Sequence, residues 1–139
     1  MNNTSENSTD IKRKFSFKKE ERLTSKKVID KLFTEGESFL SFPLKIIFFE
    51  TLLNSKFPVQ AAFSVGKRSF KLAVNRNAIK RKMRETYRLN KHNLYDALGD
   101  KQVAIFFIFI GKEIPEYTQV NIAMEKGIKK LMAKLLTEN

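Results

Sequence analysis

The 139-residue sequence has no cysteine and a single histidine, His92. Without cysteine no disulfide can form, which is the usual situation in a reducing cytoplasm, where we expect this protein to act. A zinc site built from several Cys and His ligands cannot be assembled, and neither can a nucleophile system that needs Cys or a Cys–His pair. The shortage therefore excludes two common classes of enzyme site.

Long apolar runs are also missing. The longest covers the eight residues 103–110, whereas a membrane-spanning helix needs about 20 apolar residues. The first ten residues contain no apolar segment of the kind found in signal peptides. We therefore expect a soluble, non-secreted protein with no membrane partner.

Motifs for phosphate chemistry are absent as well. The sequence has no Walker loop and no G-x-G-x-x-G, and its acidic residues are scattered. A two-metal nuclease needs carboxylates that converge on ions about 4 Å apart, and no D-x-D or similar cluster supplies them. We expect no catalytic residue and no metal site on this chain, so that any chemistry belongs to a partner.

What the sequence does have is positive charge, concentrated in one stretch. Residues 66–91 hold ten Lys or Arg and one acid, so they supply +9 of the formal net charge of +12. A clustered basic surface is typical of a nucleic-acid-binding protein. We favour this interpretation over a solvated charged face, because solvated helices usually mix charges of both signs.

From about residue 77 the basic stretch has helical spacing, with apolar residues and cations each recurring every four positions. The apolar stripe is Ile79, Met83 and Tyr87, and the cationic stripe is Arg76, Lys80, Arg84 and Arg88. Like charges at this spacing cost about 0.2 to 0.5 kcal/mol per pair in an isolated helix, and a polyanion would remove that cost. Asn75 and Asn77 are both candidates for the N-cap.

The rest of the chain predicts a small α+β sandwich in a single domain, residues 15–139, after a disordered polar tail, residues 1–14. A first helix is expected to begin at Thr24 or Ser25 and to end at Gly36. Strands are expected at residues 43–50 and 59–65, and the apolar run 101–110 predicts a central strand buried on both faces. A closing amphipathic helix follows Pro115.

Two apolar features leave alternatives open. Phe15 and Phe17 lie among cations and could stack on bases, or they could dock on the domain. In the strand 43–50, Lys45, Ile47 and Phe49 share one face. That face either receives single-stranded nucleic acid or forms a second layer of core under a helix.

The segment 73–88, AVNRNAIKRKMRETYR, resembles the RNR signature of the bacterial ribonuclease P protein subunit. Ala78 stands where the family usually has the second Arg of R-N-R, and Lys82 or Arg76 is expected to compensate. The motifs E-R-L, F-x-x-G and F-S-V-G-K-R occur in family order, so the resemblance covers about residues 15–136. The matching positions of the signature are Arg76, Asn77, Ile79, Lys80, Arg81, Arg84, Glu85, Tyr87 and Arg88.

The resemblance implies an α-β-β-β-α-β-α fold with an unusual left-handed βαβ crossover at the basic helix. It implies the protein half of a ribonucleoprotein endonuclease that removes the 5′ leader from precursor tRNA. In that family the RNA subunit performs catalysis with Mg²⁺, so we expect the protein alone to be inactive, with Mg²⁺ held by RNA and phosphates. The implied partners are ribonuclease P RNA and precursor tRNA, with no obligate protein partner.

The resemblance also assigns two sets of residues. The leader of the precursor is expected in a cleft between the first helix and the open sheet face, lined by Phe33, Lys45, Ile47 and Ser64, with Lys67 and Arg68 at its edge. Phe49 lies on the same strand face as Lys45 and Ile47, and we add it as a candidate for base stacking. The RNA subunit is expected to contact Lys67, Arg68, Lys71, Arg76, Asn77, Lys80, Arg81, Arg84 and Arg88. The alternatives are a structural RNA-binding protein of ribosomal type and a nuclease with its own active site.

Overall fold

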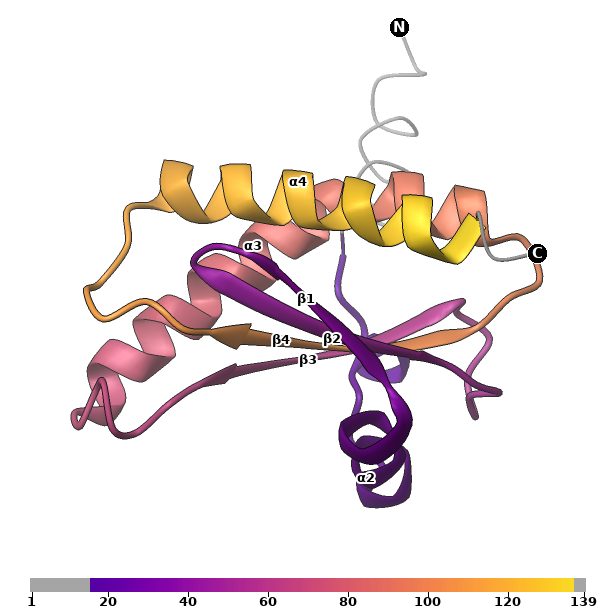
Figure 1. The fold of residues 1–139 in the computed structure, drawn as a ribbon, viewed down its shortest axis with the longest axis horizontal. Helices are drawn as coiled ribbons and strands as arrows, with labels where there is room; N and C mark the ends of the chain where they lie inside the picture. The colour runs from indigo at the N-terminus through magenta and orange to yellow at the C-terminus, as the bar shows by residue number, and fades with distance from the viewer. Residues whose placement is uncertain (1–15, 137–139) are drawn as a thin grey trace, which may run out of the picture.

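A computed structural model describes residues 16–136, so the predicted tail, residues 1–14, and Phe15 lie outside the described part. A four-stranded sheet separates two layers of helix, with α3 and α4 on one face and α2 on the other (Figure 1). The elements in chain order are η1 (Lys19–Glu21), α2 (Lys26–Glu35), β1 (Glu37–Ser41), β2 (Leu44–Glu50), β3 (Val59–Val65), α3 (Ala73–Leu98), β4 (Val103–Phe109) and α4 (Tyr117–Leu136).

The strands are ordered β1-β2-β4-β3 across the sheet. β1, β2 and β4 pair in antiparallel fashion, whereas β3 pairs with β4 in parallel, so the chain must cross over between them. The basic helix α3 is that crossover, and it lies on the same side of the sheet as α4 (Figure 1). This arrangement confirms the predicted α+β class and the order of elements.

The first helix begins and ends close to the predicted positions, for identifiable reasons. The Ser25 hydroxyl accepts a hydrogen bond from the Val28 backbone N–H at 3.3 Å, which satisfies one of the free donors at the start of α2. At the other end, Gly36 lies close to two backbone carbonyls. A Cβ at this position would lie 2.4 Å from the Leu32 oxygen and 2.9 Å from the Phe48 oxygen. The turn from α2 into β1 therefore requires a residue without a side chain.

We expect Gly36→Ala to destabilise the fold by about 1 to 3 kcal/mol, because backbone must move to admit the methyl group. Gly66→Ala is the matched control, since a Cβ there meets nothing within 4 Å. The control is expected to be neutral or to stabilise by about 0.4 to 1 kcal/mol through the unfolded chain. Urea unfolding of the three proteins measures both effects, and equal stability of the two variants would contradict the packing argument.

The core between the sheet and the two long helices contains an aromatic cluster. The rings of Phe63 and Phe107 stack with centroids 5.3 Å apart, and Tyr87 of α3 packs against both at 5.6 and 5.4 Å. Phe17 adds edge-to-face contacts with Phe63 and Tyr87. These contacts bury one face of β4 and show that Phe17 docks on the domain. β4 is an inner strand between β2 and β3, as predicted, but Phe106 and Ile108 on its other face are partly exposed, so the predicted burial on both faces is incomplete.

The structure differs from the sequence prediction at two boundaries. β1 was implied by the resemblance but had no strand pattern of its own, because only Phe39 of its five residues is buried. The basic helix begins at Ala73, four residues before the predicted start, and Leu72 occupies the N-cap without a side-chain hydrogen bond. Asn75 and Asn77 therefore lie inside α3 and do not cap it, so that prediction was wrong.

Candidate nucleic-acid interface

The loop that leads into α3 is held in place by a residue of the basic stripe. The Arg76 guanidinium donates hydrogen bonds through Nη1 to the carbonyl oxygens of Phe70, at 2.7 Å, and Lys71, at 2.9 Å. The Phe70 side chain is buried and packs on Phe109. Arg76 thus fixes the shape of the loop, in addition to the RNA contact that the sequence predicts for it.

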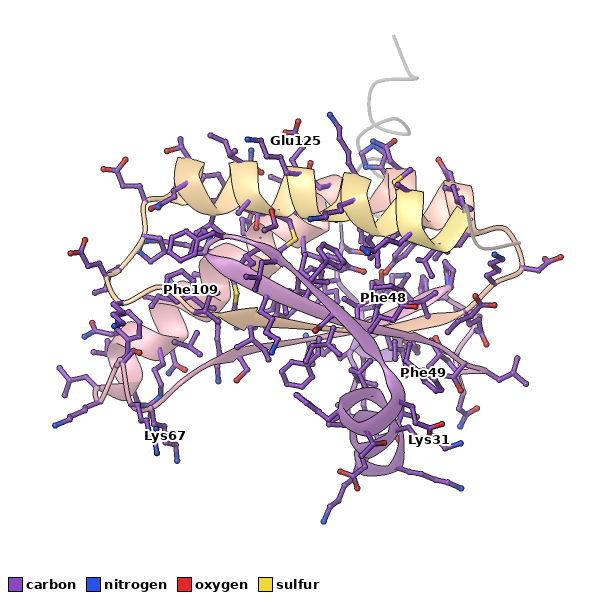
Figure 2. The ribbon with its side chains drawn as sticks, viewed as in Figure 1. Lys31, Phe48, Phe49, Lys67, Phe109 and Glu125 are labelled. Atoms are coloured by element: carbon purple, nitrogen blue, oxygen red, sulfur yellow. The ribbon has the colours of Figure 1, made fainter. Side chains whose placement is uncertain are left out.

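The most exposed of the predicted RNA-subunit contacts lie in this loop and on the outer face of α3. Lys67, Arg68 and Lys71 are exposed in the loop, and Figure 2 shows Lys67 at the end of the molecule where α3 begins. The exposed surface continues along the helix through one amide and two arginines at spacings of four and three, which lie on one helical face. Those helical residues are Asn77, Arg81 and Arg84, all exposed.

Two further predicted contacts are partly covered. Lys80 is half-buried beside the sheet, and Arg88 is half-buried with its guanidinium paired to the Glu85 carboxylate. Glu85 is the single acid in the basic stretch. Because both groups of this pair are partly solvated, the pair is weak and leaves Arg88 able to exchange partners. The structure therefore brings the predicted cations together on one side of the molecule.

The compensation expected for Ala78 is not available in the structure. The Lys82 ammonium donates to the Pro115 carbonyl at 2.7 Å, and Arg76 holds the loop carbonyls. Lys82 therefore ties α3 to the segment before α4. Both cations already make structural hydrogen bonds. Neither can replace the arginine that is missing at position 78 without giving up such a bond.

The face of the sheet opposite α3 and α4 is only partly covered. Strand pairing places Leu40, Lys45, Ile108 and Ser64 in one row across the four strands, and we call these residues the open row. Lys45, Ile108 and Ser64 are each partly exposed. The row mixes a cation, a hydroxyl and apolar surface, which suits an extended polyanion with exposed bases.

The other predicted leader residues lie nearer α2. Ile47 is 6% exposed and packs in a small core with Leu32 of α2, so its side chain is not part of the exposed surface. Phe49 is half-buried against the same core. Phe33 is 52% exposed, and its ring contacts Phe106 edge-to-face with centroids 5.1 Å apart. The sequence left two alternatives for this face of the strand, a nucleic-acid surface or a second core layer under a helix. At Ile47 the second alternative is correct, because Ile47 is buried under α2.

A buried ion pair ties the segment before α2 to the basic helix. The Lys91 ammonium pairs with the Glu21 carboxylate and also donates to the Ser16 carbonyl. Glu21 Oε1 accepts a hydrogen bond from the Tyr95 hydroxyl at 2.6 Å, and Oε2 accepts from the Lys18 backbone N–H at 2.7 Å. The Glu21 carboxylate therefore accepts from three donors, two on α3 and one on the segment before η1, and so joins η1 to α3.

Burial sets the protonation of this network. It raises the pKa of Tyr95 and of Tyr87 far above their ordinary value, so both hydroxyls stay protonated. Burial also lowers the pKa of Lys91, while the hydrogen bond to the Glu21 carboxylate opposes that shift. A charged Lys91 in this position consequently depends on its carboxylate partner.

Sequence reasoning counted Lys91 in the basic stretch without assigning it an RNA contact and did not foresee its burial, and its side chain is only 3% exposed. A usable signal was present, since Lys91 follows Ile79, Met83 and Tyr87 at the same spacing of four. Reasoning from the sequence also missed Leu40 and Ile108 of the open row. Their place became visible only once the strand register was known.

Within residues 16–136, no three of the His, Cys, Asp and Glu side chains come together where they could hold a metal ion. In the same range, none of the helices combines the length and the apolar character that crossing a bilayer requires.

Comparison with known proteins connects this geometry to a family. Residues 17–136 match the family model described as Ribonuclease P. A curated relative from Porphyromonas gingivalis, the "Ribonuclease P protein component", is 38% identical over 119 residues, covering 82% of this chain and 85% of the relative. A protein of the same description from Chlorobaculum tepidum is 36% identical over 91 residues, covering 60% of this chain and 59% of the relative.

Solved structures share the fold. The ribonuclease P protein from Thermotoga maritima superposes with a TM-score of 0.62 at 23% identity, covering 79% of this chain and 96% of that one. A Staphylococcus aureus ribonuclease P protein gives a TM-score of 0.61 at 18% identity, covering 80% and 94%. The family model spans almost every described residue, and the P. gingivalis relative is matched over most of its length. The chain therefore belongs to the ribonuclease P protein family.

Proposed function

We propose that the exposed cations of α3 and of the loop before it bind the RNA subunit of ribonuclease P, while the open row receives the 5′ leader of precursor tRNA. As a member of its family the chain serves as the protein subunit of the enzyme in tRNA 5′ processing. The family match sets aside the alternative of a ribosomal-type protein. We also propose that the protein acts in the cytoplasm.

One observation carries the assignment of the RNA-subunit surface. Between residues 66 and 84 the chain has eight basic residues and no acid, and five of these cations are exposed on the loop and the outer face of α3. Exposed like charges repel each other unless a polyanion neutralises them. An RNA backbone supplies that charge, and its counterions are released on binding, which favours the complex further.

The open row supports the assignment of the leader. Lys45 supplies a charge for a phosphate, and Ser64 supplies a hydroxyl donor two strands away in the same row. Phe33 offers an exposed ring at the edge of α2. A base that stacks on such a ring gains about 1 to 3 kcal/mol without regard to its identity, so contact with the leader would tolerate many sequences.

The division of labour leaves the bond-breaking step to the RNA. Catalytic Mg²⁺ is held by RNA phosphates, and the protein cations replace diffusible ions around the assembled RNA. The protein therefore lowers the Mg²⁺ concentration at which the complex is active. It contributes binding and positioning, and we expect it to be inactive alone.

Cleavage of a precursor tRNA at low Mg²⁺ tests this proposal. Three samples are compared: the protein alone, a bacterial ribonuclease P RNA alone, and both together. We expect cleavage at the mature 5′ end only in the mixture. Cleavage by the protein alone would reveal an active site on this chain, and a mixture no more active than the RNA alone would contradict the proposed role.

Two variants separate the two surfaces. Lys45→Ala is expected to raise the KM for precursor with little effect on the affinity for the RNA subunit. Lys67→Ala with Arg68→Ala is expected to weaken the affinity for the RNA subunit. If both variants lost only affinity for precursor, the division between the surfaces would be wrong.

A further inference from the structure

A second basic stripe runs along α4 on the side that faces β1. Lys126, Lys130 and Lys134 recur every four residues and so share one helical face. The ammonium groups of Lys130 and Lys134 lie over the Phe39 ring of β1, at 5.5 and 5.7 Å from its centroid. The contacts hold these two lysines at the edge of the sheet, with their charges beside apolar surface.

Exposed apolar side chains lie next to this stripe. Phe42, in the turn between β1 and β2, is 70% exposed, and Ile122 of α4 is 54% exposed. Both line a depression of about 450 Å³ together with Lys126 and Lys130. Phe42 also lines a second depression of about 370 Å³, which includes Lys112 and Glu113. The Phe42 ring therefore stands between two hollows, each of which has a cation in its lining.

The backbone under this surface is firmly placed. Gly127 allows α4 to approach the sheet, since a Cβ there would lie 2.5 Å from Ile46 Cδ1. The Ser41 hydroxyl donates to the Ala123 carbonyl at 2.7 Å, which joins the end of β1 to the middle of α4. A surface set on rigid elements loses little conformational entropy when it binds a ligand.

This surface is separate from the α3 interface. α3 packs over β3, whereas α4 packs over β1 and β2 at the other edge of the sheet. Figure 1 shows the two helices side by side above the sheet, with β1 on the α4 side. The two basic surfaces thus flank the molecule, and a single phosphate backbone on α3 leaves the α4 stripe unneutralised.

The charges on this face decide which partner fits. The residues that line the larger depression include two lysines and no acid. A second copy of the chain, placed across a two-fold axis at this face, would bring the lysines of both copies together. On the same helix, Lys129 has its own carboxylate, that of Glu125, at 3.7 Å, and Figure 2 shows Glu125 pointing outward from the sheet.

We propose that Phe42, Ile122, Lys126 and Lys130 form a second RNA-binding surface that takes a single-stranded segment, with a base stacked on Phe42 and phosphates at the lysines. The combination of an exposed ring with a row of cations is how proteins bind single strands without sequence preference. The proposal rests on RNA being the partner of this protein, but it does not depend on the α3 interface.

The test uses the full chain and a fluorescent 12-nucleotide oligouridine, in a background of Arg81→Gln with Arg84→Gln that weakens the α3 interface. In this background Phe42→Ala is expected to reduce the affinity by about tenfold, which is the scale of one lost base stack. Phe42→Tyr is expected to retain affinity because it keeps the ring. Lys126→Gln with Lys130→Gln is expected to lower the affinity and its salt dependence.

Lys129→Gln is the matched control, because this lysine is exposed on the same helix and lies off the proposed surface. The single variants Lys126→Gln and Lys130→Gln are compared with this control. If Lys129→Gln lost as much affinity for oligouridine as either of them, charge alone would explain binding and the proposal would be overturned. Crosslinking with 4-thiouridine in the oligonucleotide is expected to mark the peptide that contains Phe42. Crosslinks confined to α3 and its loop would likewise overturn it.

Dimerisation provides a further readout. If Phe42→Ala altered sedimentation while the affinity for oligouridine stayed unchanged, the surface would belong to a second copy of the chain. Failure here is distinct from failure of the proposed function. If only the second surface is wrong, the protein and the RNA subunit together still cleave the precursor, and Phe42→Ala leaves the affinity for oligouridine unchanged. If the proposed function is wrong, the mixture does not cleave the precursor.

Discussion

Replacing Glu21 with alanine is expected to cost the folded protein about 3 to 5 kcal/mol of unfolding free energy, a large part of what a domain of this size has. The substitution leaves the ammonium of Lys91 buried without its carboxylate, at a side-chain exposure of 3%. It also removes the acceptor for the Tyr95 hydroxyl and for the Lys18 backbone N–H. An unpaired buried charge is far more costly than the pair is favourable.

The double variant Glu21→Leu with Lys91→Met is the informative control. It removes both charges and keeps similar volume, so it is expected to recover most of the loss. Urea unfolding of the wild type, Glu21→Leu, Lys91→Met and the double variant completes a thermodynamic cycle that isolates the coupling of the pair. A Glu21→Ala protein within about 0.5 kcal/mol of the wild type would show that the pair is solvated, contrary to its burial.

The Glu21–Lys91 pair also affects function, because it helps to position two parts of the fold relative to each other. The pair, together with Phe17 packed on Tyr87, joins the segment before α2 to the middle of α3. α2 borders the open row and α3 carries the exposed cations, so the network sets the position of one proposed RNA surface relative to the other. Lys91 serves this buried link, and under the proposal above the RNA contacts fall to the exposed cations of the loop and of α3.

The extent to which sequence predicted this structure can be traced to individual residues. The apolar run of β4 and the stripe of Ile79, Met83 and Tyr87 gave the right elements because burial dictates both patterns. β1 escaped pattern reasoning because it is an edge strand with one buried residue, Phe39, and its position comes from pairing with β2. Pairing between distant segments leaves little trace in local sequence.

The start of α3 shows the same limit. Asn75 and Asn77 have the side chains that favour an N-cap, yet the helix starts earlier. The Arg76 guanidinium bonds the Phe70 and Lys71 carbonyls and the Phe70 ring is buried, so tertiary contacts hold the preceding loop. Tertiary packing here overrides the local preference of asparagine for the N-cap. Arg76, predicted as an RNA contact, also has a structural role that its spacing in the sequence could not reveal.

Neutralising two exposed arginines of the basic helix, Arg81→Gln with Arg84→Gln, is expected to weaken binding to a ribonuclease P RNA by about 25- to 60-fold at roughly 0.1 M salt. Each phosphate contact makes log K fall by about 0.7 to 0.9 per tenfold rise in salt. Two lost contacts should therefore lower that slope by about 1.4 to 1.8. Binding isotherms over a series of KCl concentrations measure the affinity and the slope together.

The control carries the same change of charge on another element. Lys26→Gln with Lys27→Gln neutralises two exposed lysines at the start of α2, on the opposite face of the sheet. If the interface is the outer face of α3, this pair should leave the slope nearly unchanged. Equal losses from both pairs would mean that net charge alone attracts the RNA, because a diffuse field does not distinguish where a cation lies. A reduced slope for the α3 pair alone places phosphates on that helix.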